Sequence, residues 1–93
     1  MSLVVEGAGG TITVPGAVLS EIAARAAEGV EGVHVRRRRS VDVEARTVSL
    51  GLAASRGEPL TAVGERVQEQ VVAAFRGMCG LDLTVDVKIE ELR

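Results

Sequence analysis

The stretch LTAVGERVQEQVVAAFRGMCGLDLTVDVKI, residues 60–89, decides the fold because its hydrophobic period changes from that of a helix to that of a strand. Over residues 60–78 the apolar side chains recur at spacings of three and four, which places them on one helix face. These side chains are Leu60, Val63, Val67, Val71, Ala74, Phe75 and Met78. Gly80 ends this helix, and residues 83–89 then alternate between apolar and polar side chains. The stretch therefore predicts a long amphipathic helix followed by a strand with one buried face.

The residues before this stretch show the same two periods in shorter elements. Residues 11–14 alternate and predict a short strand, and an amphipathic helix of about four turns follows them. Gly29 and Gly32 are expected to end that helix, because glycine accepts the left-handed backbone conformation that often follows a helix. Residues 33–44 predict one bent strand or two short ones, joined in a hairpin to a strand over residues 47–54.

These elements predict an α+β fold. Its expected architecture is a two-layer sandwich in β-α-β-β-α-β order, with two helices packed on one face of a sheet of about four strands. Residues 10–93 form the predicted domain, and the glycine-rich residues 1–9 are expected to be a flexible leader. Because the strands alternate rather than run continuously apolar, we expect the other sheet face to be polar and open to water or to a partner.

Composition narrows the classes of function. The 93 residues are 46% hydrophobic, which indicates a packed core rather than a disordered chain. One Phe without Tyr or Trp argues against an aromatic platform for nucleic-acid bases and against an aromatic-lined ligand pocket. One His and one Cys cannot build an all-protein zinc site or a disulfide framework. The sequence shows no signal peptide or membrane span, so a cytoplasmic domain is expected.

No arrangement of reactive side chains predicts catalysis. His34 is the sole imidazole, but it lies between valines of a predicted strand and has no recognisable nucleophile beside it, so an exposed strand histidine is expected. Cys79 lies at the C-terminal end of the long helix, which does not activate a thiol, and a small, partly buried residue is expected there. Asp42 with Glu44 has the spacing of any solvated strand face. We therefore expect no catalytic, metal-binding or cofactor-binding residue.

The most distinctive candidate for a contact site is a set of four consecutive arginines. We call them the arginine run: Arg36, Arg37, Arg38 and Arg39. In an extended chain, successive members point to opposite sides. One interpretation is a contact site for an anion on a lipid, a nucleic acid or an acidic protein surface. The other is a solvated hairpin whose arginines face acids across the strands, Asp42 and Glu44 among them. The net charge of −2 and the scarcity of aromatics argue against nucleic acid. Among partners, a protein is expected ahead of nucleic acid or anionic lipid.

Several short motifs keep a common order along the chain. The first group is GTITVP at residues 10–15, VLSEIA at 18–23 and AAEGVEGV at 26–33. The second group is VGERVQEQV at 63–71, MCGL at 78–81 and VDVKI at 85–89. Together they resemble the alkaline shock protein family, also called the general stress protein family, of Gram-positive bacteria. The resemblance extends over residues 10 to about 91.

The resemblance implies a non-enzymatic binding or scaffolding protein of the general or envelope (alkaline) stress response. Such cytoplasmic domains gather at the inner face of the membrane through a membrane-anchored partner, which can be another family member. Apart from the resemblance, self-association through a strand edge is expected because the core is so small. The family supplies no catalytic residue and no cofactor. The alternative function is an anion-binding module that binds nucleic acid or anionic lipid through the arginine run.

Overall fold

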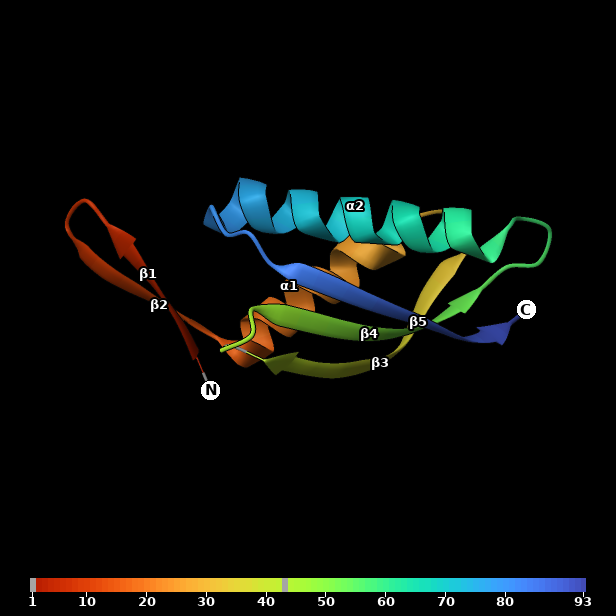
Figure 1. The fold of residues 1–93 in the computed structure, drawn as a ribbon, viewed down its shortest axis with the longest axis horizontal. Coiled ribbons are helices and arrows are strands. Elements are labelled where there is room, and N and C mark those ends of the chain that lie inside the picture. Colours follow the sequence, from red (N-terminus) through yellow and green to blue (C-terminus); the bar gives the residue numbers. More distant parts are fainter. Residues whose placement is uncertain (1, 43) are drawn as a thin grey trace.

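A three-stranded sheet with two helices on one face forms the main body of the molecule, and a two-stranded hairpin projects from one end (Figure 1). The computed structural model describes residues 2–42 and 44–93, with side chains for all of these except residues 2, 3, 5–7 and 37–40. In chain order the elements are β1 (Ser2–Gly7), β2 (Gly10–Pro15), α1 (Gly16–Glu28), β3 (Val33–Asp42), β4 (Thr47–Ala54), α2 (Leu60–Cys79) and β5 (Thr84–Leu92).

The strand order of the sheet is β3-β4-β5. Strands β3 and β4 form the expected antiparallel hairpin, and β3 is one strand whose register shifts between Val35 and Arg37 and again between Arg38 and Ser40. Such irregularities bend a strand, which accounts for the broken alternation in the sequence. Strand β5 runs parallel to β4, so α2 is the crossover that a parallel connection requires. The middle strand of the sheet is therefore β4.

The core lies between the sheet and the two helices. Both helices turn their apolar stripes toward the sheet, α1 mainly over β3 and α2 over β5, and Phe75 of α2 is completely buried there. The largest fully buried side chains are Phe75, Leu19, Leu50, Leu52, Val48, Val67 and Val71. The α+β class and the two predicted helices are therefore confirmed, and the helix-facing side of the sheet is the apolar side that the alternation predicted.

Glycines end both helices, but only one of them does so in the predicted way. Gly80 adopts the left-handed conformation with φ +66° after α2. Gly29 instead keeps a right-handed φ of −71°, because the chain continues in a turn in which the Val30 N–H donates to the Ala27 carbonyl. The positive φ comes later, at Gly32, where φ is +79°. Val30 is thereby carried into the core before β3 begins.

The N-terminal segment differs from the expectation. Residues 2–7 of the expected flexible leader form β1, which pairs antiparallel with β2 in register from Ser2 opposite Pro15 to Gly7 opposite Gly10. Strand β2 consequently lies outside the main sheet, which has three strands rather than about four. The physical reason is local: two apolar runs separated by a glycine-rich turn pair with each other at a lower loop-closure cost than with distant strands. We call this β1–β2 hairpin the arm.

Candidate functional site

The arginine run lies on an edge strand. Because the sheet order is β3-β4-β5, the outer side of β3 has no neighbouring strand within the described residues. Residues 33–39 therefore lie on an edge of the sheet. Arg36 is the only member of the run whose side chain is described, and the side chains of Arg37, Arg38 and Arg39 lie outside the described part of the structure.

Arg36 forms an ion pair across the open face of the sheet. Its Nη1 lies 2.9 Å from Oε2 of Glu91 on β5, and both side chains remain about two-fifths exposed (41% and 39%). The pair spans β4, where Gly51 and Ala53 offer no long side chain to obstruct it, and both of these small residues are buried. Glu91 Oε1 also lies 3.5 Å from Nε of Arg93. The open face is thus polar, as expected, and one arginine of the run already has an acidic partner.

The acid that pairs with Arg36 is not one that the sequence suggested. Asp42 accepts a 3.0 Å hydrogen bond from the Ala45 N–H and so belongs to the β3–β4 turn. Sequence reasoning missed Glu91 because its proximity depends on the parallel alignment of β5 with β4, where Glu91 is the register partner of Ala53. The only available signal was the acidic character of the C-terminal residues.

A helix side chain reaches each edge of the sheet. On β3, the Val35 N–H donates to Oε2 of Glu28 at 3.4 Å, so this donor points away from β4. On β5, Nε2 of Gln68 donates to the Val85 carbonyl at 3.0 Å, so this acceptor also points outward. Beside the β5 edge lies a groove of about 420 Å³ between α2 and the strand. Its lining includes Leu60, Gly64, Gln68, Val87 and Ile89.

The two edges carry opposite charges. Strand β3 contains the arginine run, whereas β5 contains Asp86, Glu90 and Glu91 with Lys88 as its one cation. Charges on an edge strand discourage indiscriminate pairing with other strands and select partners of complementary charge. A partner strand with acidic side chains therefore fits the β3 edge better than the β5 edge.

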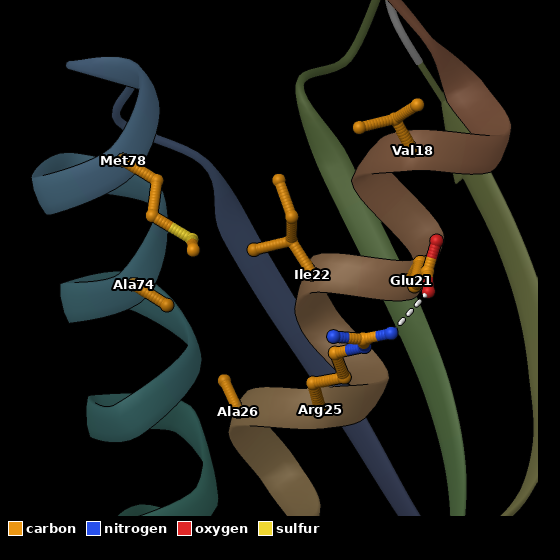
Figure 2. A pocket seen from close by; sticks show the side chains of 7 residues that line it. All are labelled: Val18, Glu21, Ile22, Arg25, Ala26, Ala74 and Met78. Atoms are coloured by element: carbon orange, nitrogen blue, oxygen red, sulfur yellow. Dashed lines mark ion pairs between the residues drawn. The ribbon is translucent and has the colours of Figure 1, made fainter.

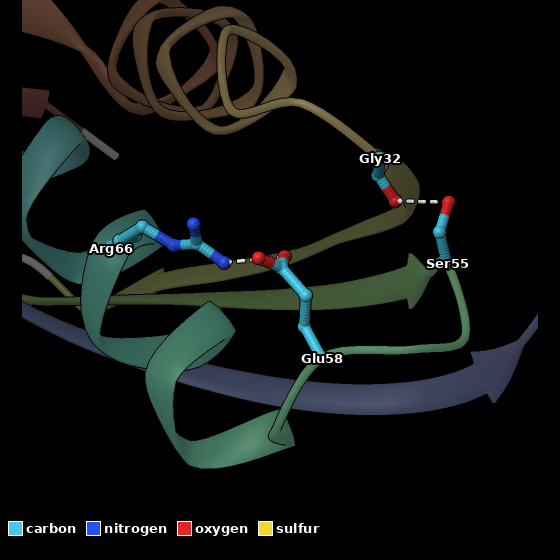
Figure 3. A network of polar contacts seen from close by, with 4 residues as sticks. All are labelled: Gly32, Ser55, Glu58 and Arg66. Atoms are coloured by element: carbon cyan, nitrogen blue, oxygen red, sulfur yellow. Dashed lines mark hydrogen bonds and ion pairs between the residues drawn. The ribbon is translucent and has the colours of Figure 1, made fainter.

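A network of polar contacts fixes the loops at the C-terminal end of β4 (Figure 3). Ser55 Oγ donates to the Gly32 carbonyl at 3.2 Å, which ties the β4–α2 loop to the turn before β3. Arg66 Nη2 lies 2.6 Å from Glu58 Oε2, and both side chains are about half exposed. Together with Arg56, these groups line a hollow of about 310 Å³. Because every charged group here is solvated, we interpret the network as a clamp on the loops.

A second groove lies on the helical face, between α1 and α2 (Figure 2). It has a volume of about 540 Å³ and is lined mainly by apolar side chains, with one ion pair at its rim, 2.9 Å between Arg25 Nη2 and Glu21 Oε1. Figure 2 shows Ile22 of α1 and Met78 of α2 pointing toward one another across it. Met78, which the sequence placed on the buried stripe, is 73% exposed.

The remaining candidates have unremarkable surroundings. His34 is an exposed strand residue, and Cys79 is partly buried, as the sequence predicted for both. Over residues 2–42 and 44–93, no cluster of three or more His, Cys, Asp or Glu side chains has the geometry to hold a metal ion. None of the helices that the structure describes is long and apolar enough to cross a membrane.

Comparisons with known proteins identify no relative: no family model, no curated protein and no solved structure matches the chain. The resemblance to the alkaline shock proteins therefore stays a prediction from short motifs.

Proposed function

We propose that the protein is a non-enzymatic binding or scaffolding module that pairs with a partner protein through the β3 edge of its sheet. The observation that carries the proposal is the outer edge of β3, where the Val35 N–H points away from the sheet beside the arginine run. An extended segment of a partner can add to such an edge by main-chain hydrogen bonds, and its side chains then confer specificity.

The contacts that now occupy this edge are weak enough to be exchanged. The Glu28 carboxylate meets the Val35 N–H at a long 3.4 Å, and the Arg36–Glu91 pair is partly solvated. An ion pair with this exposure contributes no more than about 1 kcal/mol. A partner strand with a backbone acceptor opposite Val35 and a carboxylate near Arg36 replaces both contacts with equivalent ones. The expected partner is therefore a protein with an extended, acidic segment.

The cellular setting is part of the same proposal and rests on the sequence resemblance alone. We place the protein in the general or envelope stress response of a Gram-positive bacterium, in the cytoplasm. There it would gather at the inner membrane face by binding a membrane-anchored protein. The β3 edge supplies the contact that such recruitment needs.

The test is a proline at Val35, because proline removes an outward-pointing donor that the partner strand would use. The Val35 N–H points to Glu28 and not to β4, so the β3–β4 pairing keeps its own hydrogen bonds. We expect Val35→Pro to remain folded by circular dichroism and to lose the partner in a cross-linked pull-down from membrane and soluble fractions. Without the outward donor, the partner strand loses a strand-pairing hydrogen bond. The amount of partner that is captured should therefore fall at least about tenfold.

The matched control is Val87→Pro on the opposite edge. Val87 is also a partly buried valine of an edge strand, and it lies two residues after Val85, whose carbonyl points outward. Residues two apart in a strand direct their backbone groups to the same side. Partner capture should survive Val87→Pro. Equal capture by folded Val35→Pro and wild type would contradict the β3 assignment.

The same pull-down also tests the anion-binding alternative. A variant with all four arginines of the run changed to Ser separates contacts made by charge from those made by the backbone. Recovery of nucleic acid, or of anionic vesicles, that depends on the arginines and falls steeply with salt would favour that alternative, since each phosphate contact adds roughly one unit to the log–log slope. Protein recovery that Val35→Pro abolishes favours strand pairing.

A further inference from the structure

The arm has apolar side chains that the described chain leaves more than half exposed, Val4 and Ile12. Ile12 and Val14 are two residues apart in β2, so they share one face of the ribbon, and Thr11 and Thr13 lie on the other. Val14 packs against the edge of the core, whereas Ile12, farther along the arm, is 58% exposed. An isolated two-stranded hairpin is at best marginally stable in water. The arm therefore needs a third surface to pack against.

The described body of the chain does not supply that surface. Strand β2 ends at Pro15 and α1 begins at Gly16, so no linker lets the arm fold back over the helices. Pro15 is extended, with φ −61° and ψ 147°, and Figure 1 shows the arm projecting away from the body. Within the described chain, α1 is the only element outside the arm with which it makes more than minor contact.

The accessible surface area and the radius of gyration both show that the molecule is less compact than a monomer of its mass should be. The chain exposes 5629 Å². A compact monomer of this mass exposes about 5,100 Å², so the excess is about 500 Å². The radius of gyration, 13.6 Å, exceeds the value of about 12 Å expected for the chain length. Each partner in a standard protein interface buries about 800 Å². The excess of about 500 Å² is most of the area that one partner buries.

The α1–α2 groove is the second uncovered apolar surface of the molecule. Val18 and Met78 stand at its mouth, 43% and 73% exposed, and the small side chains of Ala26 and Ala74 leave its floor open. Its two charged side chains, Glu21 and Arg25, form an ion pair with each other and so have no net charge. Figure 1 shows that α1 begins and α2 ends on the side of the body from which the arm projects.

We propose that the arm of one copy seats its apolar face in the α1–α2 groove of a second copy, and that the second copy returns the contact. Each chain has one arm and one groove at the same end, so a two-fold axis satisfies both at once and closes the assembly as a dimer. Neither surface offers the unpaired cations that a nucleic acid or an anionic membrane would require, whereas the exposed apolar side chain of Ile12 matches a mainly apolar groove whose one charge pair is neutral overall. Both sheet edges stay free in this dimer, so the inference is independent of the function proposed for β3.

The test compares three variants of the full-length protein by sedimentation over a concentration series. Ile12→Lys puts a charge on the apolar face of the arm, and Met78→Glu puts one at the mouth of the groove. Both residues are more than half exposed, so neither change disturbs the core. Thr13→Lys is the matched control, because the adjacent position lies on the other face of the arm. Far-UV circular dichroism and thermal unfolding verify that each variant is folded.

We expect the wild type and Thr13→Lys to dimerise equally. Ile12→Lys and Met78→Glu should each raise the dimer Kd by about a hundredfold, tenfold for each of the two equivalent contacts. An equimolar mixture of these two variants should form dimers again. In the mixed pair one intact arm meets one intact groove, and the introduced Lys meets the introduced Glu at the other contact.

Three results would overturn the proposal. The first is a wild-type protein that stays monomeric across the series. The second is a dimer that Ile12→Lys weakens but Met78→Glu does not, which assigns the arm to another arm or to a sheet edge. The third is failure of the mixture to restore dimers although each variant is folded.

Discussion

The arm and the body are built from the same kinds of residue and end in opposite environments. In the body, Leu50 and Leu52 of β4 are buried because two helices lie across their face of the sheet. In the arm, Ile12 alternates with Thr11 and Thr13 in the same way, but it is 58% exposed. The difference is the presence of a second layer. An alternating strand shows which side chains can be buried, and only its surroundings decide whether they are.

The largest effect in this comparison is expected at the centre of the body. Phe75→Ala removes the only aromatic side chain from a completely buried position, so it loses both transfer free energy and packing contacts. Phe-to-Ala changes at such sites lower the free energy of unfolding by about 3–5 kcal/mol. Chemical denaturation monitored by circular dichroism measures the change.

The control for this prediction is Val4→Ala in the arm, at protein concentrations too low for association. Val4 is 56% exposed, so the free energy of unfolding should change by no more than about 0.5 kcal/mol. A comparable loss of unfolding free energy at both sites would show that the arm contributes to the core, and would contradict the contrast between the arm and the body.

An intermediate effect is expected where two loops of the body meet. At Gly32 the φ of +79° disfavours any side chain, and an added Cβ would lie 3.0 Å from Ser55 Oγ. Gly80 has a similar φ of +66° but open space around its Cβ position. Gly80→Ala should therefore cost only the backbone term, about 1 kcal/mol, and Gly32→Ala about 1–2 kcal/mol more.

Thermal and urea unfolding of the two alanine variants separate these contributions. Because the backbone term is shared, the difference between the variants reports the crowding at Ser55. Equal destabilisation would mean that the Ser55 side chain moves aside at no cost, and that the clamp between the two loops is loose. Adding Ser55→Ala to Gly32→Ala should recover much of the excess, since it removes the crowded hydroxyl.

The sequence was sufficient for every element except β1 and insufficient for their arrangement. Helix α2 and the β3–β4 hairpin follow from local periodicity, which is strong over long segments, and both were predicted within a few residues. The arm was missed because Gly7 and Gly10 were interpreted as flexibility, although the same glycines close a tight hairpin turn. The partner of Arg36 was missed because it depends on a parallel alignment between strands far apart in sequence. The α1–α2 groove was missed because periodicity places Met78 on the apolar stripe of α2 but does not show where α1 packs against that stripe. The packing of the two helices leaves Met78 uncovered.

The smallest effect is expected on the open face of the sheet, where no layer covers the side chains. Arg36→Gln removes the ion pair with Glu91, and because both groups are about two-fifths exposed, the free energy of unfolding should fall by less than about 1 kcal/mol. Screening by salt should shrink even this loss, so urea denaturation at low and at high ionic strength measures it. Arg25→Gln is the control, since its pair with Glu21 lies within one helix turn and is more exposed. Suppose that Arg36→Gln lowers the free energy of unfolding by several kcal/mol, and by the same amount at low and at high ionic strength. The arginine would then stabilise the sheet itself, and the edge would not be available for exchange with a partner.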